Sequence, residues 1–108
     1  MFSGIFYEVT FLLGYFMSKI IIDHNPSKER LAELGVSSWE IWDCPPTEFE
    51  LNFDTATEKA YVLEGEFEVY PQGGEKVVVK AGDFVEFHKG LKSHWKVTKQ
   101  LKKHYKHF

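Results

Sequence analysis

The feature that most constrains this sequence is a series of short apolar segments between Glu58 and Trp95, separated by glycine-containing turns. Turn signals stand at residues 73–74, 81–83 and 89–90. Strand-forming segments with turns at such close and regular spacing are typical of β-sandwiches and β-barrels. The stretch therefore predicts an all-β fold.

A clear period of two marks residues 48–54, where apolar and polar side chains alternate. Phe49, Leu51 and Phe53 fall on one face of the expected strand, and this face should point inward. Two further strands, at residues 59–63 and 66–70, are expected to join through Glu64 and a glycine. The remaining strands are expected at residues 19–22, 76–80, 83–87 and 93–97, with another in the tail from residue 101.

One short helix is predicted over residues 26–34. Asn25 suits the N-cap and is followed by a proline, which is favoured at the first helical position. Gly35 suits the end of the helix, because glycine readily adopts the left-handed conformation found there. Trp39 and Trp42 follow the helix, and we expect both rings to pack beneath it as part of the core.

Length and charge argue against a multidomain protein and against a nucleic-acid-binding protein. The chain has 108 residues, which allows one domain with a real core, and 17% of them are aromatic, which suits a barrel filled by rings. The net charge is -3, so no overall basic field recruits nucleic acid. Nine lysines and only two acids follow from Lys76 onward. This asymmetry predicts basic strands beside acidic ones or, as the alternative, an anion site near the C-terminal lysines.

The single cysteine, Cys44, excludes an internal disulfide and fits a reducing compartment, so we expect a cytoplasmic protein. Without a visible base beside it, Cys44 is expected to be a partly buried, inert thiol.

Residues 1–16 differ from the rest because they are apolar and aromatic with one charge, Glu8. They lack the basic region and cleavage site of a signal peptide, and charges and glycines interrupt the length that a membrane span needs. We interpret them as an extension outside a domain over residues 17–108. The alternative is an added strand or a contact surface for a partner. No membrane partner is expected for residues 17–108.

Two motifs carry a family resemblance. YVLEGEFEV, followed by a turn and AGDFVEFHKG, resembles the two sequence motifs of the cupin superfamily. With WEIW, F-x-L-x-F-D and W-K-V, the chain from about residue 17 is similar to small single-domain cupins grouped with the (S)-ureidoglycine aminohydrolase type. The resemblance implies a single cupin jelly-roll β-barrel with one short N-terminal helix. It also implies a homodimer, because cupins of this size often pair through sheet edges.

The same resemblance implies where a metal would be bound. The usual cupin site takes His-x-His and a glutamate from the first motif and a histidine from the second. Glu58 matches the glutamate. The first pair falls on Leu51 and Phe53, or on the two positions 52 and 54 in the other register, and the last ligand falls on Ser93. None of these is histidine.

We therefore expect function without a metal cofactor. The alternative is a rebuilt site for Mn or another divalent transition metal, made from Asp54, Glu58 and a displaced His88 or His94. A shift of one residue along a strand turns a side chain to the opposite face, which argues against His94. His104 and His107 are expected to be surface residues.

The mouth of the expected barrel defines a candidate ligand pocket. Its predicted lining is Phe53, Glu58, Ala60, Phe87, Ser93 and Trp95. Glu58 is a candidate general acid or base, because a carboxyl group among rings would be poorly solvated. The alternative is that a neighbouring hydroxyl group or lysine satisfies it.

Three functions follow from this reading. The first is metal-independent binding of a small polar or anionic metabolite in the barrel mouth. The second is a metal-dependent enzyme acting on a small ureido or other carbon-nitrogen compound. The third is a dimeric scaffold with a filled barrel. Whether the chain is an enzyme stays open at this point.

Overall fold

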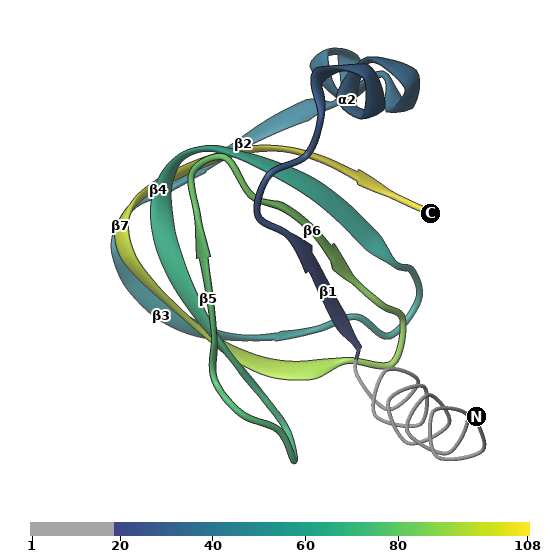
Figure 1. The fold of residues 1–108 in the computed structure, drawn as a ribbon. Helices are drawn as coiled ribbons and strands as arrows, with labels where there is room; N and C mark the ends of the chain where they lie inside the picture. Colours follow the sequence, from purple (N-terminus) through teal and green to yellow (C-terminus); the bar gives the residue numbers. More distant parts are fainter. Residues whose placement is uncertain (1–18) are drawn as a thin grey trace, which may run out of the picture.

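The structure is a computed structural model and describes residues 19–108. Its described part is an antiparallel β-barrel with the helix α2 across one end (Figure 1). The elements in chain order are β1 (Ile20–Asp23), α2 (Lys28–Leu34), the 3-10 helix η1 (Val36–Ser38), β2 (Glu40–Cys44), β3 (Thr47–Asn52), β4 (Glu58–Pro71), β5 (Val77–Lys80), β6 (Phe84–Phe87) and β7 (Lys92–His107). The expected all-β fold with one short helix is confirmed. The expected extension at residues 1–16 lies outside the described residues.

The two long strands β4 and β7 form the spine of the barrel. They pair along their whole length, from Glu58 opposite His107 to Pro71 opposite Ser93. The pairing register shifts at three points between Val62 and Phe67, and such irregularities bend a strand pair. Two strands were expected at residues 59–63 and 66–70, whereas the structure has one strand that bends there. The segments expected at residues 93–97 and in the tail are likewise one strand, β7.

Gly65 permits the bend. Its φ is 93°, in the left-handed region, and a Cβ atom at this position would collide with the carbonyl oxygen of Gln100 on β7. Only glycine lets the two backbones come this close while adopting that angle.

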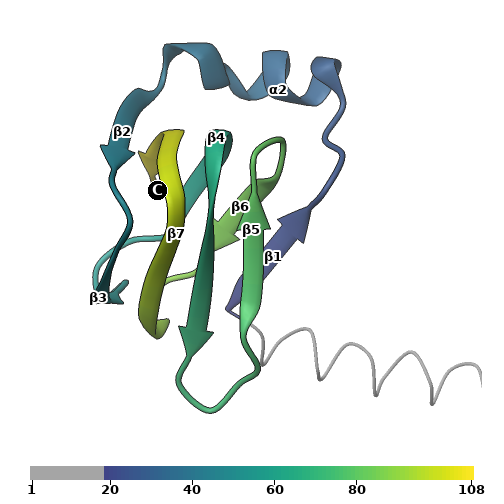
Figure 2. The same ribbon diagram turned by 90° about the vertical axis from the view of Figure 1, so that its left-hand side faces the viewer.

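Because β4 and β7 bend, each contributes to both walls of the barrel. One wall has the strand order β1, β6, first half of β4, second half of β7 and β2. The other wall combines β5, the second half of β4, the first half of β7 and β3. Figure 2 shows β3, β7, β4 and β5 side by side on this second wall. Residues 49–53, on β3 and just after it, therefore lie near the second half of β7 across the barrel.

The helix begins later than expected. Ser27 is the N-cap, and its hydroxyl oxygen accepts a hydrogen bond from the Arg30 backbone N–H at 3.1 Å. The prediction of Asn25 was wrong, because the Asn25 N–H instead donates to the Asp23 carboxylate in a turn after β1. Gly35 ends the helix with φ 70°, as expected.

The core has two parts. The larger fills the barrel with aromatic and branched side chains, among them Phe67, Phe87, Trp95 and Leu101. The smaller lies beneath α2 and contains Val36, Trp39 and Phe84, with Leu31 and Leu34 packed against it. The prediction for Trp39 is confirmed. The prediction for Trp42 was wrong, because its ring packs against the barrel cluster rather than the helix cluster.

The uneven charge of the sequence has a simple structural basis. The first half of β7 is basic and lies between the acidic strands β3 and β4. Lys96 pairs with Glu48 at 3.8 Å and Lys99 pairs with Glu66 at 3.9 Å. Basic and acidic strands thus lie side by side, as expected. Exposed pairs of this kind add at most about 1 kcal/mol each to the free energy of unfolding.

No helix in residues 19–108 has the length and apolar character needed to cross a membrane.

Candidate functional site

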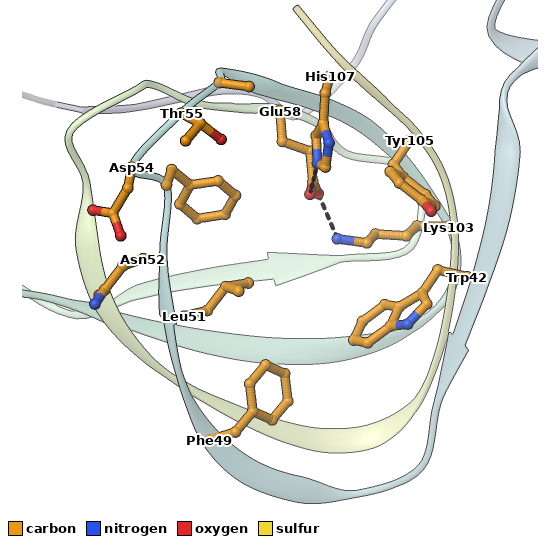
Figure 3. Close-up of a pocket in the computed structure, with 12 residues that line it drawn as sticks. Trp42, Phe49, Leu51, Asn52, Asp54, Thr55, Glu58, Lys103, Tyr105 and His107 are labelled. Carbon is orange, nitrogen blue, oxygen red and sulfur yellow. Dashed lines mark hydrogen bonds and ion pairs between the residues drawn. The ribbon is translucent and has the colours of Figure 1, made fainter.

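A pocket of about 310 Å³ lies at one end of the barrel (Figure 3). Side chains of β2, β3, β7, the segment between β3 and β4, and the start of β4 surround it. Its lining consists of Trp42, Phe49, Leu51, Asn52, Phe53, Asp54, Thr55, Ala56, Glu58, Lys103, Tyr105 and His107. Aromatic and aliphatic groups form most of the wall, and a few charged groups converge at one side. This is the usual composition of a small-molecule site.

Strand alternation explains which side chains reach the pocket. On β3, Phe49 and Leu51 point inward, while Glu48 and Glu50 face solvent. The expected inward face of this strand is confirmed. On β7 the same alternation turns Lys103 inward, because it stands between Leu101 and Tyr105 at a spacing of two.

The charged groups of the pocket form a connected chain of three side chains. The Lys103 ammonium nitrogen lies 2.6 Å from Glu58 Oε2. His107 Nε2 lies 3.3 Å from Glu58 Oε1. Lys103 and Glu58 are only 3% and 7% exposed in their side chains, whereas His107 is 55% exposed. The chain therefore runs from a buried amine to a group in contact with solvent.

Aromatic rings surround the Lys103 ammonium group. Its nitrogen lies 4.7 Å from the ring centre of Trp95, 5.0 Å from that of Trp42 and 5.8 Å from that of Tyr105. Burial lowers the pKa of Lys103 from its ordinary value, and the neighbouring Glu58 carboxylate offsets only part of this effect. The site thus holds an amine whose charged form is disfavoured by burial.

The structure places the six predicted lining residues in two groups. Phe53 and Glu58 line the pocket. The other four are buried in the barrel and do not reach the pocket wall: Ala60, Phe87, Ser93 and Trp95. Rings occupy the space between them, since Phe53 stacks on Phe87 with centres 5.3 Å apart.

Ser93, at the position of the expected second-motif histidine, has a structural role. Its hydroxyl donates a hydrogen bond to the Leu51 carbonyl oxygen at 2.6 Å and accepts one from Trp95 Nε1 at 3.2 Å. These bonds fix the Trp95 ring that lies against the Lys103 ammonium group.

The residues of the alternative metal site do not converge. His94 faces outward and lies 2.7 Å from Glu50, and His88 lies 3.1 Å from Glu86. Asp54 pairs with Lys92 at the rim. Within residues 19–108, no three histidine, cysteine or acidic side chains are placed to hold a metal ion. With Leu51 and Phe53 at the other ligand positions, this set of side chains does not fit the usual cupin metal.

Sequence reasoning missed Lys103, Trp42 and Tyr105 as pocket residues. The available signal was the alternation of Leu101, Lys103 and Tyr105, which assigns a lysine to an inward face. His107 was expected to be a surface residue, and it is exposed, yet it also contacts Glu58.

The remaining singled-out side chains have structural roles. His104 was expected to be a surface residue, but it is half-buried, and its Nδ1 lies 3.0 Å from the Trp39 carbonyl oxygen. Cys44 is buried and free, and burial raises the pKa of its thiol, with Lys103 opposing in part. Both the burial and the raised pKa agree with the expected inert thiol.

Comparison with known proteins identifies the family. The model of the EutQ-like cupin domain matches residues 31–105. A DUF861 family protein from Thermotoga maritima is 42% identical, with a TM-score of 0.78, and the match covers 82% of this chain and 99% of that one. A search of curated proteins found no significant match.

Two solved EutQ structures are more distant. The putative ethanolamine utilization protein Q from Salmonella typhimurium is 25% identical, with a TM-score of 0.57, over 63% of this chain and 54% of that one. EutQ from Clostridium difficile is 22% identical, with a TM-score of 0.56, over 63% and 52%. The match therefore spans about half the length of these EutQ chains, and the second likeness supports the fold alone.

Proposed function

The chain belongs to the EutQ-like cupin domain family, and we propose that it binds a small polar or anionic ligand in the mouth of its barrel without a metal cofactor. The observation that carries this proposal is the buried pair of Lys103 and Glu58, which faces a pocket of about 310 Å³ with mostly apolar walls.

A buried ion pair needs an explanation, because well-packed apolar residues are often as stable or more stable in its place. The Lys103 ammonium group carries three N–H donors. Among residues 19–108, Glu58 is its one hydrogen-bonding partner. An acceptor atom of a ligand, such as a carboxylate or carbonyl oxygen, would take a second donor. The pair thus supplies the polar anchor that a mostly apolar pocket requires for specificity.

The size and lining of the pocket limit the size and chemical character of the ligand. A volume of about 310 Å³ is at the lower end of the range of roughly 300–1,000 Å³ for ligand sites, so the ligand is small. The rings of Trp42 and Phe49 line the pocket and offer contact to a flat or apolar body (Figure 3). Phe53 also belongs to the lining. A polar head group would lie at Lys103, with the exposed His107 beside it.

The positive charge of Lys103 beside Glu58 supports binding without a metal. In a metal-containing cupin, the cation neutralises the glutamate of the first motif. Here the ammonium group of Lys103 lies 2.6 Å from that glutamate, Glu58, and already neutralises it. A divalent cation would have to displace this ammonium group and find further ligands among hydrocarbon side chains.

Binding can be tested with the tryptophan fluorescence of the purified chain. A panel of small carboxylates, amides and ureido compounds would be titrated with and without EDTA, so that ureidoglycine-like ligands are included. We expect at least one class to bind in the presence of EDTA. Replacing Lys103 by Met should weaken binding by at least about tenfold, since a hydrogen bond to a charged group is worth about 1.5–3 kcal/mol.

Lys99→Met is the matched control, because Lys99 lies on the same strand but is exposed on the outer face. Trp42→Phe should remove most of the fluorescence change if the ligand lies in this pocket. Binding that requires an added metal, or that is unchanged in Lys103→Met, would contradict the proposal.

A further inference from the structure

We propose that Lys103 is a reactive amine that forms an imine with a small aldehyde or ketone in the pocket. The inference rests on the proposed ligand pocket and adds covalent chemistry to it. The supporting observations are the position of the Lys103 amine, the rings around it, and its connection to Glu58 and His107.

The surroundings of Lys103 are those of a nucleophilic lysine. An exposed lysine in water is protonated at neutral pH and has no free electron pair to attack with. Lys103 is 3% exposed in its side chain, lies among the rings of Trp42, Trp95 and Tyr105, and lines the pocket. Desolvation in an apolar pocket activates lysine for imine formation, because it disfavours the charged ammonium form.

A path exists for the proton that the ammonium group must lose. Glu58 Oε2 lies 2.6 Å from the amine nitrogen, within reach for direct proton transfer. The other carboxylate oxygen lies 3.3 Å from His107 Nε2. The imidazole is 55% exposed, so the connected side chains reach from the buried amine to solvent. A purely structural ion pair would need no third titratable group leading to water.

The reaction balances with the groups present. Glu58 takes a proton from the Lys103 ammonium group, and the neutral amine attacks the carbonyl carbon of the ligand. The carbonyl π bond breaks, and its oxygen takes up the proton that the attacking nitrogen loses, which gives a carbinolamine. Glu58 then returns a proton to the hydroxyl group, which leaves as water while the carbon-nitrogen double bond forms. No oxidant or reductant is needed.

The surroundings also stabilise the product. The protonated imine carries a positive charge at the position of the former ammonium group. The same three rings and the Glu58 carboxylate therefore remain beside a cation. The other lysines offer a contrast, since Lys99, for example, is 72% exposed and pairs with Glu66 on the outer face.

Reductive trapping of the full chain tests the proposal. The protein would be incubated with pyruvate or acetaldehyde and cyanoborohydride, digested, and the adduct at each lysine quantified by mass spectrometry. We expect Lys103 to be modified at least about tenfold faster than Lys99, because its amine is activated by desolvation. Glu58→Gln should slow labelling of Lys103 by about 100-fold, since general acid–base catalysis contributes at least this factor, and should leave Lys99 unchanged.

Lys103→Arg should remove this adduct while keeping the charge, whereas Lys99→Arg is the matched control and should leave the Lys103 adduct in place. If Lys103→Arg does not fold, the ratio of labelling at Lys103 and Lys99 in the wild-type chain still shows whether Lys103 is the more reactive amine. Equal labelling of the two lysines overturns the inference.

Fluorescence titration of the same probes without reductant separates the inference from the proposed function. Binding of pyruvate that depends on Lys103 but yields no adduct overturns imine formation and leaves ligand binding intact. If neither probe binds or forms an adduct, the imine is overturned, and the wider panel of carboxylates, amides and ureido compounds still decides the proposed function.

Discussion

The ammonium nitrogen of Lys103 lies 2.6 Å from Glu58 Oε2, although the two residues come from different strands and are 45 positions apart in the sequence. Both side chains are buried beside the pocket, and the register of β4 and β7 places Glu58 opposite His107 and Lys103 opposite Val62. Breaking the pair should therefore affect both the stability of the barrel and the polarity of the candidate site, and the two effects can be measured separately.

Removing one partner of this pair should destabilise the protein strongly. Lys103→Met leaves the buried Glu58 carboxylate with only His107 beside it. We expect the free energy of unfolding in urea to fall by about 3–5 kcal/mol, as when other buried pairs are broken. The double variant Lys103→Met, Glu58→Met should recover much of this loss. If Lys103→Met alone leaves the unfolding midpoint unchanged, the pair does not stabilise the fold.

His94 should make stability depend on pH. The hydrogen bond to Glu50 raises the pKa of His94 above its ordinary value of 6.5, with Glu48 adding to the effect. The folded state therefore holds this proton more tightly than the unfolded state does. The resulting stabilisation is fully present below pH 6.5 and is lost as the pH rises through the raised pKa of the folded state.

The test compares urea unfolding of the wild type and His94→Gln across this range. The variant should be less stable than the wild type at acidic pH, and the difference should disappear in alkaline solution. NMR titration of His94 in Glu50→Gln should show a pKa closer to 6.5 than in the wild type. A stability difference that is the same at both ends of the range would refute this account.

Much of the barrel could be predicted from local patterns. The period of two at Phe49, Leu51 and Phe53 identifies an inward face, because each of these strand residues has only two directions available. Glycines at turns mark strand ends equally well. The exception was Gly65, which was read as a junction between two strands. A glycine in a bulge and a glycine in a turn look alike in sequence, since both adopt positive φ.

The site was harder to predict than the fold. Lys103 stands among many lysines on β7, so composition does not separate the one inward side chain from its exposed neighbours. Only the alternation with Leu101 and Tyr105 identifies Lys103 as the lysine that points inward. Its partner Glu58 was found by motif, but no local pattern connects residues 45 positions apart. The prediction for Trp42 also failed because it depends on a long-range contact. The pairing of β2 with β7 sets how far Trp42 lies from the helix, and no local pattern shows this pairing.

Gly65 should tolerate no side chain. Gly65→Ala forces a left-handed backbone angle and places the new Cβ against the carbonyl oxygen of Gln100. We expect a loss of more than about 4 kcal/mol or failure to fold. Gly73→Ala is the matched control, because its φ is also positive but no atom beyond its chain neighbours lies within 4 Å of the new Cβ. That variant should lose only about 1–2 kcal/mol, the cost of the angle alone. Similar losses in the two variants would show that the contact with Gln100 has no effect.

The metal content of the purified protein tests whether Lys103 takes the place of a metal beside Glu58. Two of the usual ligand positions hold Leu51 and Phe53, and the Lys103 ammonium group already neutralises Glu58. We therefore expect protein purified without a chelator or a histidine tag to contain far less than one equivalent of Mn, Fe, Ni or Zn. EDTA should leave the melting temperature unchanged, because no metal contributes to the folded state. Near-stoichiometric metal that is lost in Glu58→Gln would contradict this expectation. The alternative, metal-dependent chemistry on ureido compounds, would then become the leading hypothesis. Metal that persists in Glu58→Gln would instead be bound elsewhere on the chain and would leave the proposed pocket unaffected.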